Sequence, residues 1–175
     1  HPDRYIIVAV TLALSENGEP NLSYRDLTVY FEKKPIAPTL SRVRDAVAEI
    51  RKSKFPPLSE YGTAGSFFLN PIFTPTSVAA IRAKYPQMPV YALPEGGIKV
   101  PLAWIFDQVL HTKGRKVGGA FIWEKQPLVV ASEDGTKTND ILELAQSVVK
   151  DFFKETGIKI TPEVRMFGND REKFK

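Results

Sequence analysis

Apolar residues recur at spacings of three and four along four segments of the chain, which is the pattern of amphipathic helices. The segments lie within residues 40–50, 78–85, 102–110 and 141–152. Helix-start signals precede them: Pro38-Thr39, Thr74-Pro75, Pro101 and Thr138. Gly157 follows the last segment as a stop signal. The sequence therefore predicts four helices, of which the last is the longest.

Continuous apolar runs predict strands at 118–123 and 128–131, as a hairpin-like pair, and a last strand near 158–166. Residues 5–14, YIIVAVTLAL, are too short to span a bilayer and lack the basic start of a signal peptide, so they predict a buried strand. A buried strand needs neighbours on both sides, so we expect a fragment whose N-terminal part is missing. Residues 21–31 read as a polar connector and 58–71 as irregular.

Helices and strands follow one another without strict alternation, which predicts the α+β class. The 175 residues are 43% hydrophobic and 25% charged, an ordinary globular composition that excludes disorder. With no cysteine and two histidines, thiolate chemistry is excluded and a metal site is not expected. The net charge of +4 suits an anionic ligand, but basic residues are not interleaved with aromatic ones as in a nucleic-acid-binding domain.

The segment from Ala64 to Pro71, AGSFFLNP, is the most unusual stretch of the chain. Its glycine permits close approach of a flat ligand to the backbone, and its two phenylalanines would exclude water from the neighbourhood of Ser66. No His–Asp pair is evident to activate that serine as a nucleophile, but a serine without a base can still donate a proton to a strongly basic intermediate. The more ordinary interpretation is a turn serine beside two core phenylalanines.

Two charged residues also have two interpretations each. Lys54 ends the first predicted helix, where a cation interacts favourably with the helix dipole, but it could also contact a phosphate. Glu163 could form a surface ion pair with Arg165, or it could face a cleft as a general acid. The residues alone do not decide between the two interpretations of either side chain.

Taken together, these segments resemble the UDP-N-acetylenolpyruvoylglucosamine reductase (MurB) family from about residue 5 to residue 168. The segment from Ala64 to Phe68 with Asn70-Pro71 matches the family's specific signature. The other matching segments are Ile50-Arg51 through Lys54 and Pro56; Lys99-Val100-Pro101 through Trp104 and Asp107; Lys113-Gly114; Pro162-Glu163-Val164-Arg165 with Gly168; and the tyrosine-loop stretch Leu22-Ser23-Tyr24. Departures from the family pattern stand at Arg25, Leu69, Ala103 and Pro127.

The resemblance implies a flavoenzyme in which NADPH reduces FAD and the reduced flavin passes hydride to UDP-N-acetylglucosamine enolpyruvate. It implies that Ser66 protonates the resulting carbanion or enol and that Glu163 assists. The substrate contacts that it implies are Tyr24, Lys54, Asn70, Tyr91, Lys113 and Gln126, with Lys99 as a weaker candidate. FAD would be bound mainly by an N-terminal half that is not in this chain, and no metal is implied.

The resemblance also implies a domain division. Residues 1–38 would be the end of a FAD-binding domain with its tyrosine loop, 39–160 a substrate-binding domain, and 161–175 a closing strand and charged tail. We expect a cytoplasmic monomer that binds neither nucleic acid nor membranes. The alternative to a reductase fragment is a nucleotide-sugar-binding module without redox activity.

Overall fold

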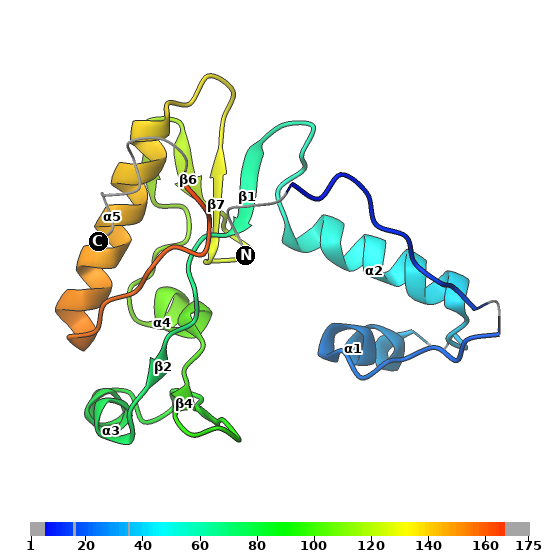
Figure 1. Ribbon diagram of the computed structural model, residues 1–175, viewed down its shortest axis with the longest axis horizontal. Helices are drawn as coiled ribbons and strands as arrows, with labels where there is room; N and C mark the ends of the chain where they lie inside the picture. The colour runs from blue at the N-terminus through cyan, green and yellow to red at the C-terminus, as the bar shows by residue number, and fades with distance from the viewer. Residues whose placement is uncertain (1–5, 16, 35, 167–175) are drawn as a thin grey trace. The chain divides into compact units, whose positions relative to one another are not determined.

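The computed structural model describes residues 6–15, 17–34 and 36–166. The chain forms two compact units, His1–Arg51 and Lys52–Lys175, and the division falls within one helix. Both units mix helices with irregular segments, and the strands found among the described residues belong to the second (Figure 1). The predicted α+β class is confirmed, because the described residues form five helices and two antiparallel sheets.

The N-terminal unit contains α1 (Arg25–Lys33) and most of α2 (Leu40–Lys54). The Tyr30 hydroxyl donates a hydrogen bond of 2.6 Å to Glu49 on α2, and the Lys34 ammonium lies 3.1 Å from the same carboxylate. The prediction of a polar connector at 21–31 is therefore wrong over α1. Only Leu27 of that helix is buried. A single buried residue gives no apolar stripe that could be recognised in the sequence.

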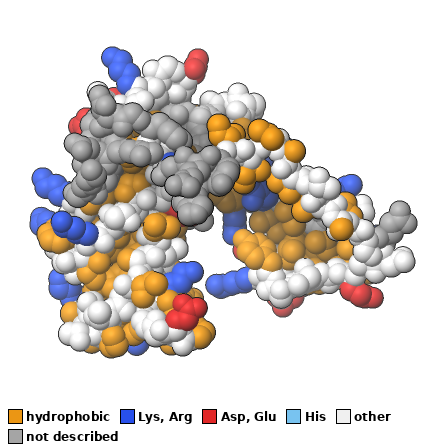
Figure 2. Space-filling model, viewed as in Figure 1, with side chains coloured by type: hydrophobic (Ala, Val, Ile, Leu, Met, Phe, Trp, Pro, Cys, Tyr) orange, Lys and Arg blue, Asp and Glu red, His pale blue; other side chains and the backbone are white. Residues whose placement is uncertain are grey.

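The strand predicted at residues 5–14 is absent from the described residues 6–14, which have no regular secondary structure. Their apolar side chains are exposed, with 89% of Ile6 and 92% of Val8 accessible. Figure 2 shows hydrophobic side chains on the surface of this unit. A strand requires hydrogen-bonding neighbours, and no described residue pairs with this segment.

The C-terminal unit contains a four-stranded antiparallel sheet in the order β1-β7-β6-β5. Its strands are β1 (Gly62–Ser66), β5 (Lys116–Val117), β6 (Ala120–Ile122) and β7 (Val129–Ser132). The predicted hairpin-like pair is confirmed as β6 and β7. A smaller sheet, β2-β4-β3, is formed by β2 (Ile72–Phe73), β3 (Tyr91–Ala92) and β4 (Ile98–Lys99).

The described residues of this unit also form three complete helices: α3 (Pro75–Lys84), α4 (Leu102–Gln108) and α5 (Thr138–Thr156). The sequence predicted all three, and Thr74 caps α3 by accepting a hydrogen bond of 3.2 Å from the Ser77 amide. The longest, α5, packs on β5 and β6 and ends at Gly157 with a φ of 70° (Figure 1). Leu144, Ala145, Val148 and Phe152 form its buried face, as its spacing indicates.

Two further predictions need correction. Residues 62–66, expected to be irregular, form β1, because Gly62 and Thr63 pair with β7 despite their turn-like composition. Residues 158–166, expected to be a strand, form only an isolated bridge between Pro162 and Phe68. A proline lacks the N–H that would extend the ladder. Residues 167–175, the rest of the predicted closing segment and tail, lie outside the described residues.

Candidate active site

A β-bulge at the end of β1 presents Ser66. The register of β1 against β7 shifts between Thr63 and Ser66, and Gly65 adopts a φ of 81°. The Thr63 hydroxyl donates a hydrogen bond of 2.8 Å to the Val130 carbonyl and accepts one of 3.1 Å from the Gly65 amide. Glycine is needed here because a side chain disfavours this backbone conformation. The bulge leaves Ser66 exposed, and sequence reasoning missed the contribution of Thr63.

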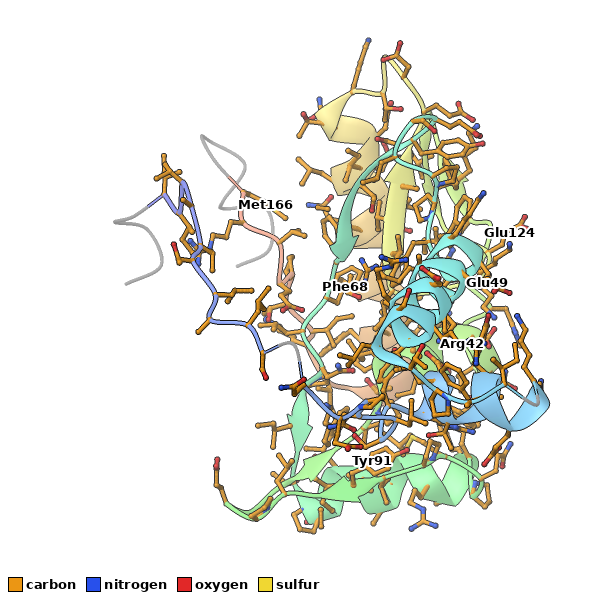
Figure 3. The ribbon with its side chains drawn as sticks, turned by 90° about the vertical axis from the view of Figure 1, so that its right-hand side faces the viewer. Arg42, Glu49, Phe68, Tyr91, Glu124 and Met166 are labelled. Carbon is orange, nitrogen blue, oxygen red and sulfur yellow. The ribbon has the colours of Figure 1, made fainter. Side chains whose placement is uncertain are left out.

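Two phenylalanines anchor the chain directly after this serine. Phe67 and Phe68 are both buried, with ring centroids 5.0 Å apart in an edge-to-face arrangement. Phe68 also packs against Phe106 of α4, with centroids 5.6 Å apart, and is labelled in Figure 3. The core phenylalanines of the ordinary interpretation are therefore present. Two features hold Ser66 in position: the buried phenylalanines that follow it, and the pairing of its strand with β7.

Glu163 lies on the segment that runs antiparallel to residues 67–69. The Glu163 amide donates a hydrogen bond of 2.8 Å to the Phe67 carbonyl, and the Leu69 amide donates one of 3.1 Å to the Thr161 carbonyl. The structure thus brings Glu163 beside the residue that follows Ser66. Both side chains are exposed, and neither forms a hydrogen bond or ion pair with any residue in the described part of the chain. Both groups are accessible to a ligand.

Gln126 lies near Ser66 through the pairing of β1 with β7, and Asn70 lies four residues after Ser66 on the same segment. The Gln126 carbonyl accepts a hydrogen bond of 3.0 Å from the amide of Val129, which is the register partner of Ser66. The Asn70 side chain accepts one of 3.0 Å from the Leu102 amide at the start of α4. Asn70 therefore has a structural contact, and its amide nitrogen still has two donors to offer a ligand.

The remaining candidates of this unit are Lys113, in the loop after α4, and two residues of the smaller sheet. Lys113 forms an ion pair of 2.8 Å with Asp107 of α4, and about a third of each side chain is exposed. An ammonium group has three donors, so Lys113 can hold Asp107 and also bind a phosphate. Tyr91, 56% exposed, is the register partner of Lys99.

The Asp107 pair predicts a pH dependence of stability. The hydrogen bond from Lys113 lowers the pKa of the Asp107 carboxyl, outweighing its desolvation. A lowered folded-state pKa gives stabilisation that is complete above the ordinary aspartate value of about 3.9 and is lost as pH falls through the lowered value. In urea unfolding, Asp107→Asn should be less stable than the parent near neutral pH, and the difference should shrink on acidification.

A matched control for this measurement is Asp134→Asn. Asp134 is exposed in a turn and forms no ion pair with any residue that the structure describes. A difference between Asp107→Asn and the parent that stays constant from neutral to acidic pH would show that the pair with Lys113 does not stabilise the fold.

Tyr24 and Lys54 are the two remaining candidates. Tyr24 belongs to the N-terminal unit, where its carbonyl accepts hydrogen bonds from Leu27 and Thr28 at the start of α1, and its side chain is 61% exposed. Lys54 is the last residue of α2 and is partly buried. Its position at a helix C-terminus agrees with the dipole interpretation.

Comparison with known proteins now gives the family. The family model described as "UDP-N-acetylenolpyruvoylglucosamine reductase, C-terminal domain" (MurB_C) matches residues 56–167, which include Ser66 and Glu163. The chain belongs to this family. Its membership confirms the resemblance of the sequence and agrees with the α+β fold.

Curated relatives carry the same description. The chain is 35% identical to the UDP-N-acetylenolpyruvoylglucosamine reductase of Escherichia coli K12 over 172 residues, which is 98% of this chain and 49% of the relative. It is 37% identical to those of Burkholderia ambifaria MC40-6, over 91% of the chain and 46% of the relative, and Haemophilus ducreyi, over 96% and 48%. The chain thus spans about half the length of the MurB relatives it matches.

The described residues show neither a metal site nor a membrane span. They contain no group of three or more histidine, cysteine, aspartate or glutamate side chains that could hold a metal ion. None of the helices in the described part of the chain is long and apolar enough to cross a bilayer.

Proposed function

We propose that this chain forms the substrate side of a MurB reductase that converts UDP-N-acetylglucosamine enolpyruvate to UDP-N-acetylmuramate. The observation that carries the proposal is the arrangement at the end of β1. An exposed serine follows a glycine-dependent bulge, and an exposed glutamate lies on the segment bonded to the next residue. Both residues lie within the part of the chain that the family model matches.

The proposed role of Ser66 is to donate a proton. Addition of hydride to one carbon of the enolpyruvyl double bond leaves an electron pair on the carbon that bears the carboxylate. The Ser66 hydroxyl gives its proton to this carbon, which completes the second C–H bond, and the serine oxygen is then reprotonated. No activating histidine is needed, because the intermediate is a strong base. Glu163 is the second group able to hold a proton at this site.

FAD, reduced by NADPH, would supply the hydride when bound. We propose that one side of its planar ring lies against Ala64 and Gly65, where the space beside the backbone is open: a Cβ built on Gly65 meets no atom within 4 Å. The sequence contains no G-x-G-x-x-G or P-loop pattern to hold the diphosphate of the cofactor. We therefore propose that residues of this chain contact only the flavin ring. Most of the FAD site would lie in the part of the relatives that this chain does not match.

The substrate carries a diphosphate, for which we propose Tyr24, Lys54 and Lys113 as contacts. Asn70, Tyr91 and Gln126 are proposed as further contacts to the substrate. Cations and hydroxyl donors are the groups that bind phosphate oxygens. NADPH and UDP-sugars are cytoplasmic metabolites, so the proposal places the protein in the cytoplasm, and nothing in it requires a second copy of the chain.

Lys54→Ala in the complete reductase should raise KM more than it lowers kcat. A point charge on a diphosphate acts about equally in the ground and transition states, so its loss weakens binding first. The expected cost is about 1.5–3 kcal/mol, the range for a hydrogen bond to a charged group, and steady-state kinetics would measure it. Tyr24→Phe should act in the same way but more weakly.

Lys52→Ala is the matched control, because Lys52 is an exposed lysine on the same last turn of α2. It removes a similar charge from the helix C-terminus and should leave KM unchanged. Equal KM values for the parent and Lys54→Ala would contradict the phosphate contact and favour the helix-dipole interpretation of Lys54.

An assay with the purified complete protein distinguishes the reductase from the binding module. With NADPH and UDP-N-acetylglucosamine enolpyruvate, the proposal predicts NADPH oxidation that depends on the UDP-sugar, and a product heavier by two hydrogen atoms in mass spectrometry. Binding of the UDP-sugar without NADPH oxidation would favour the nucleotide-sugar-binding module instead.

A further inference from the structure

The face of the four-stranded sheet opposite α5 carries a cluster of three aromatic rings. Phe121 and Trp123 are two residues apart on and just after β6, so they share a face, while the intervening Ile122 is buried in the core. Tyr61, just before β1, packs against both, with centroid distances of 5.4 Å to Phe121 and 5.8 Å to Trp123. All three rings are partly exposed.

These rings line a pocket of about 420 Å³. A volume of this size lies within the range of small-molecule sites, which are also commonly lined by aromatic side chains. None of the residues proposed for the reductase reaction lines it. Figure 3 shows Glu124, on the pocket, well away from Phe68 and Tyr91. The pocket thus does not include Ser66, Glu163 or a proposed substrate contact, although Gly114 and Lys125 on its wall are the chain neighbours of Lys113 and Gln126.

The charged residues of the pocket balance one another. Lys116 and Glu133 form an ion pair of 2.5 Å on its wall. Glu124 and Lys125, adjacent in the turn after β6, form no ion pair with any residue in the described ranges, and both line the pocket. The pocket thus offers one carboxylate and one ammonium group beside an aromatic surface. A ligand with a single charge would satisfy one of these groups and be repelled by the other.

One polar atom of the cluster also lacks a partner. The indole Nε1 of Trp123 is buried and has no hydrogen-bond acceptor in the described structure. An unsatisfied buried donor is costly, and native proteins rarely keep one without a reason. A bound ligand that brings an acceptor to this Nε1 would remove the cost.

We propose that this pocket binds a free α-amino acid with an aromatic side chain. The side chain packs on Tyr61, Phe121 and Trp123, since aromatic pairs favour edge-to-face contact beyond their area burial. The α-ammonium group pairs with Glu124 and the α-carboxylate with Lys125. A zwitterion pairs each of these two charges with an opposite one. A ligand with only a positive or only a negative charge would place a like charge near Lys125 or Glu124.

Titration of the ¹⁵N-labelled chain tests this directly, because it contains only two tryptophans. Trp104 packs against Tyr85 and does not line the pocket, so its indole N–H signal is an internal control, and Trp123→Phe assigns the two signals. The probes are L-phenylalanine, phenethylamine and 3-phenylpropionate, which share a ring and differ in charge. Phenylalanine should shift the Trp123 signal saturably and bind about tenfold or more tighter than either analogue, as for the loss of one charged contact.

Two variants assign the charges. Glu124→Gln should remove the preference for phenylalanine over 3-phenylpropionate, and Lys125→Gln should remove the preference over phenethylamine. Lys150→Gln, an exposed lysine of α5, should change neither. Equal binding of the three probes, tighter binding of a singly charged one, or no shift of the Trp123 signal would each overturn the proposal. These outcomes do not bear on the reductase reaction.

Discussion

Ser66→Ala should lower the turnover of the complete reductase by roughly 10²–10⁴-fold, the usual contribution of a positioned acid. The hydroxyl is the exposed proton donor that the bulge at Gly65 presents, and alanine keeps the backbone while removing it. KM for the UDP-sugar should change little, because the lost interaction acts in the transition state. Steady-state kinetics with the UDP-sugar varied from below KM to saturation would measure both effects.

Two other substitutions control this result. Ser66→Cys should restore part of the rate, since a thiol is also a donor of similar reach. Ser59→Ala removes an exposed turn serine shortly before β1 and should leave turnover unchanged. A Ser66→Ala enzyme with normal turnover would make Ser66 the turn serine of the ordinary interpretation.

Phe106→Ala should destabilise the C-terminal unit by about 3–5 kcal/mol, the range for truncating a buried phenylalanine. Phe106 is fully buried between Phe68 and Phe152, with ring centroids 5.6 Å and 6.1 Å away. Alanine would leave a cavity that links α4, α5 and the segment after Ser66. Urea unfolding monitored by circular dichroism should show a lower midpoint.

Phe153→Ala is the matched control, because Phe153 is the neighbour of Phe152 on α5 but is 48% exposed. Its loss should cost about 0.5 kcal/mol or less, as for surface substitutions. Equal destabilisation by the two substitutions would mean that the aromatic chain from Phe68 to Phe152 does not hold this core together.

Local signals in the sequence predict the helices of the C-terminal unit well. The apolar stripe of α5 is long and regular, and Gly157 ends it as its position predicts. The same reasoning failed where tertiary neighbours decide the structure. Residues 6–14 have the composition of a buried strand, but composition does not specify a pairing partner, and none is present among the described residues. Nor does the turn-like composition of β1 show that β7 lies beside it.

The candidate site was predictable only in part. The unusual surroundings of Ser66 can be recognised in the sequence. Glu163 is distant from it in the chain, and no rule of residue spacing predicts that the two lie near each other. The family resemblance suggested the pair, and the hydrogen bond from the Glu163 amide to the Phe67 carbonyl shows that the two backbone segments lie side by side. Neither source of prediction pointed to Thr63, whose hydroxyl shapes the bulge through contacts with Val130 and Gly65.

Stopped-flow absorbance of the flavin in the complete Ser66→Ala enzyme tests the central claim most directly, because it separates the two half-reactions. Reduction by NADPH needs no proton donor to the substrate carbon, so it should proceed near the parent rate. Reoxidation by UDP-N-acetylglucosamine enolpyruvate should slow by roughly 10²–10⁴-fold. Equal slowing of both half-reactions, or of neither, would contradict the assignment of Ser66 as the proton donor.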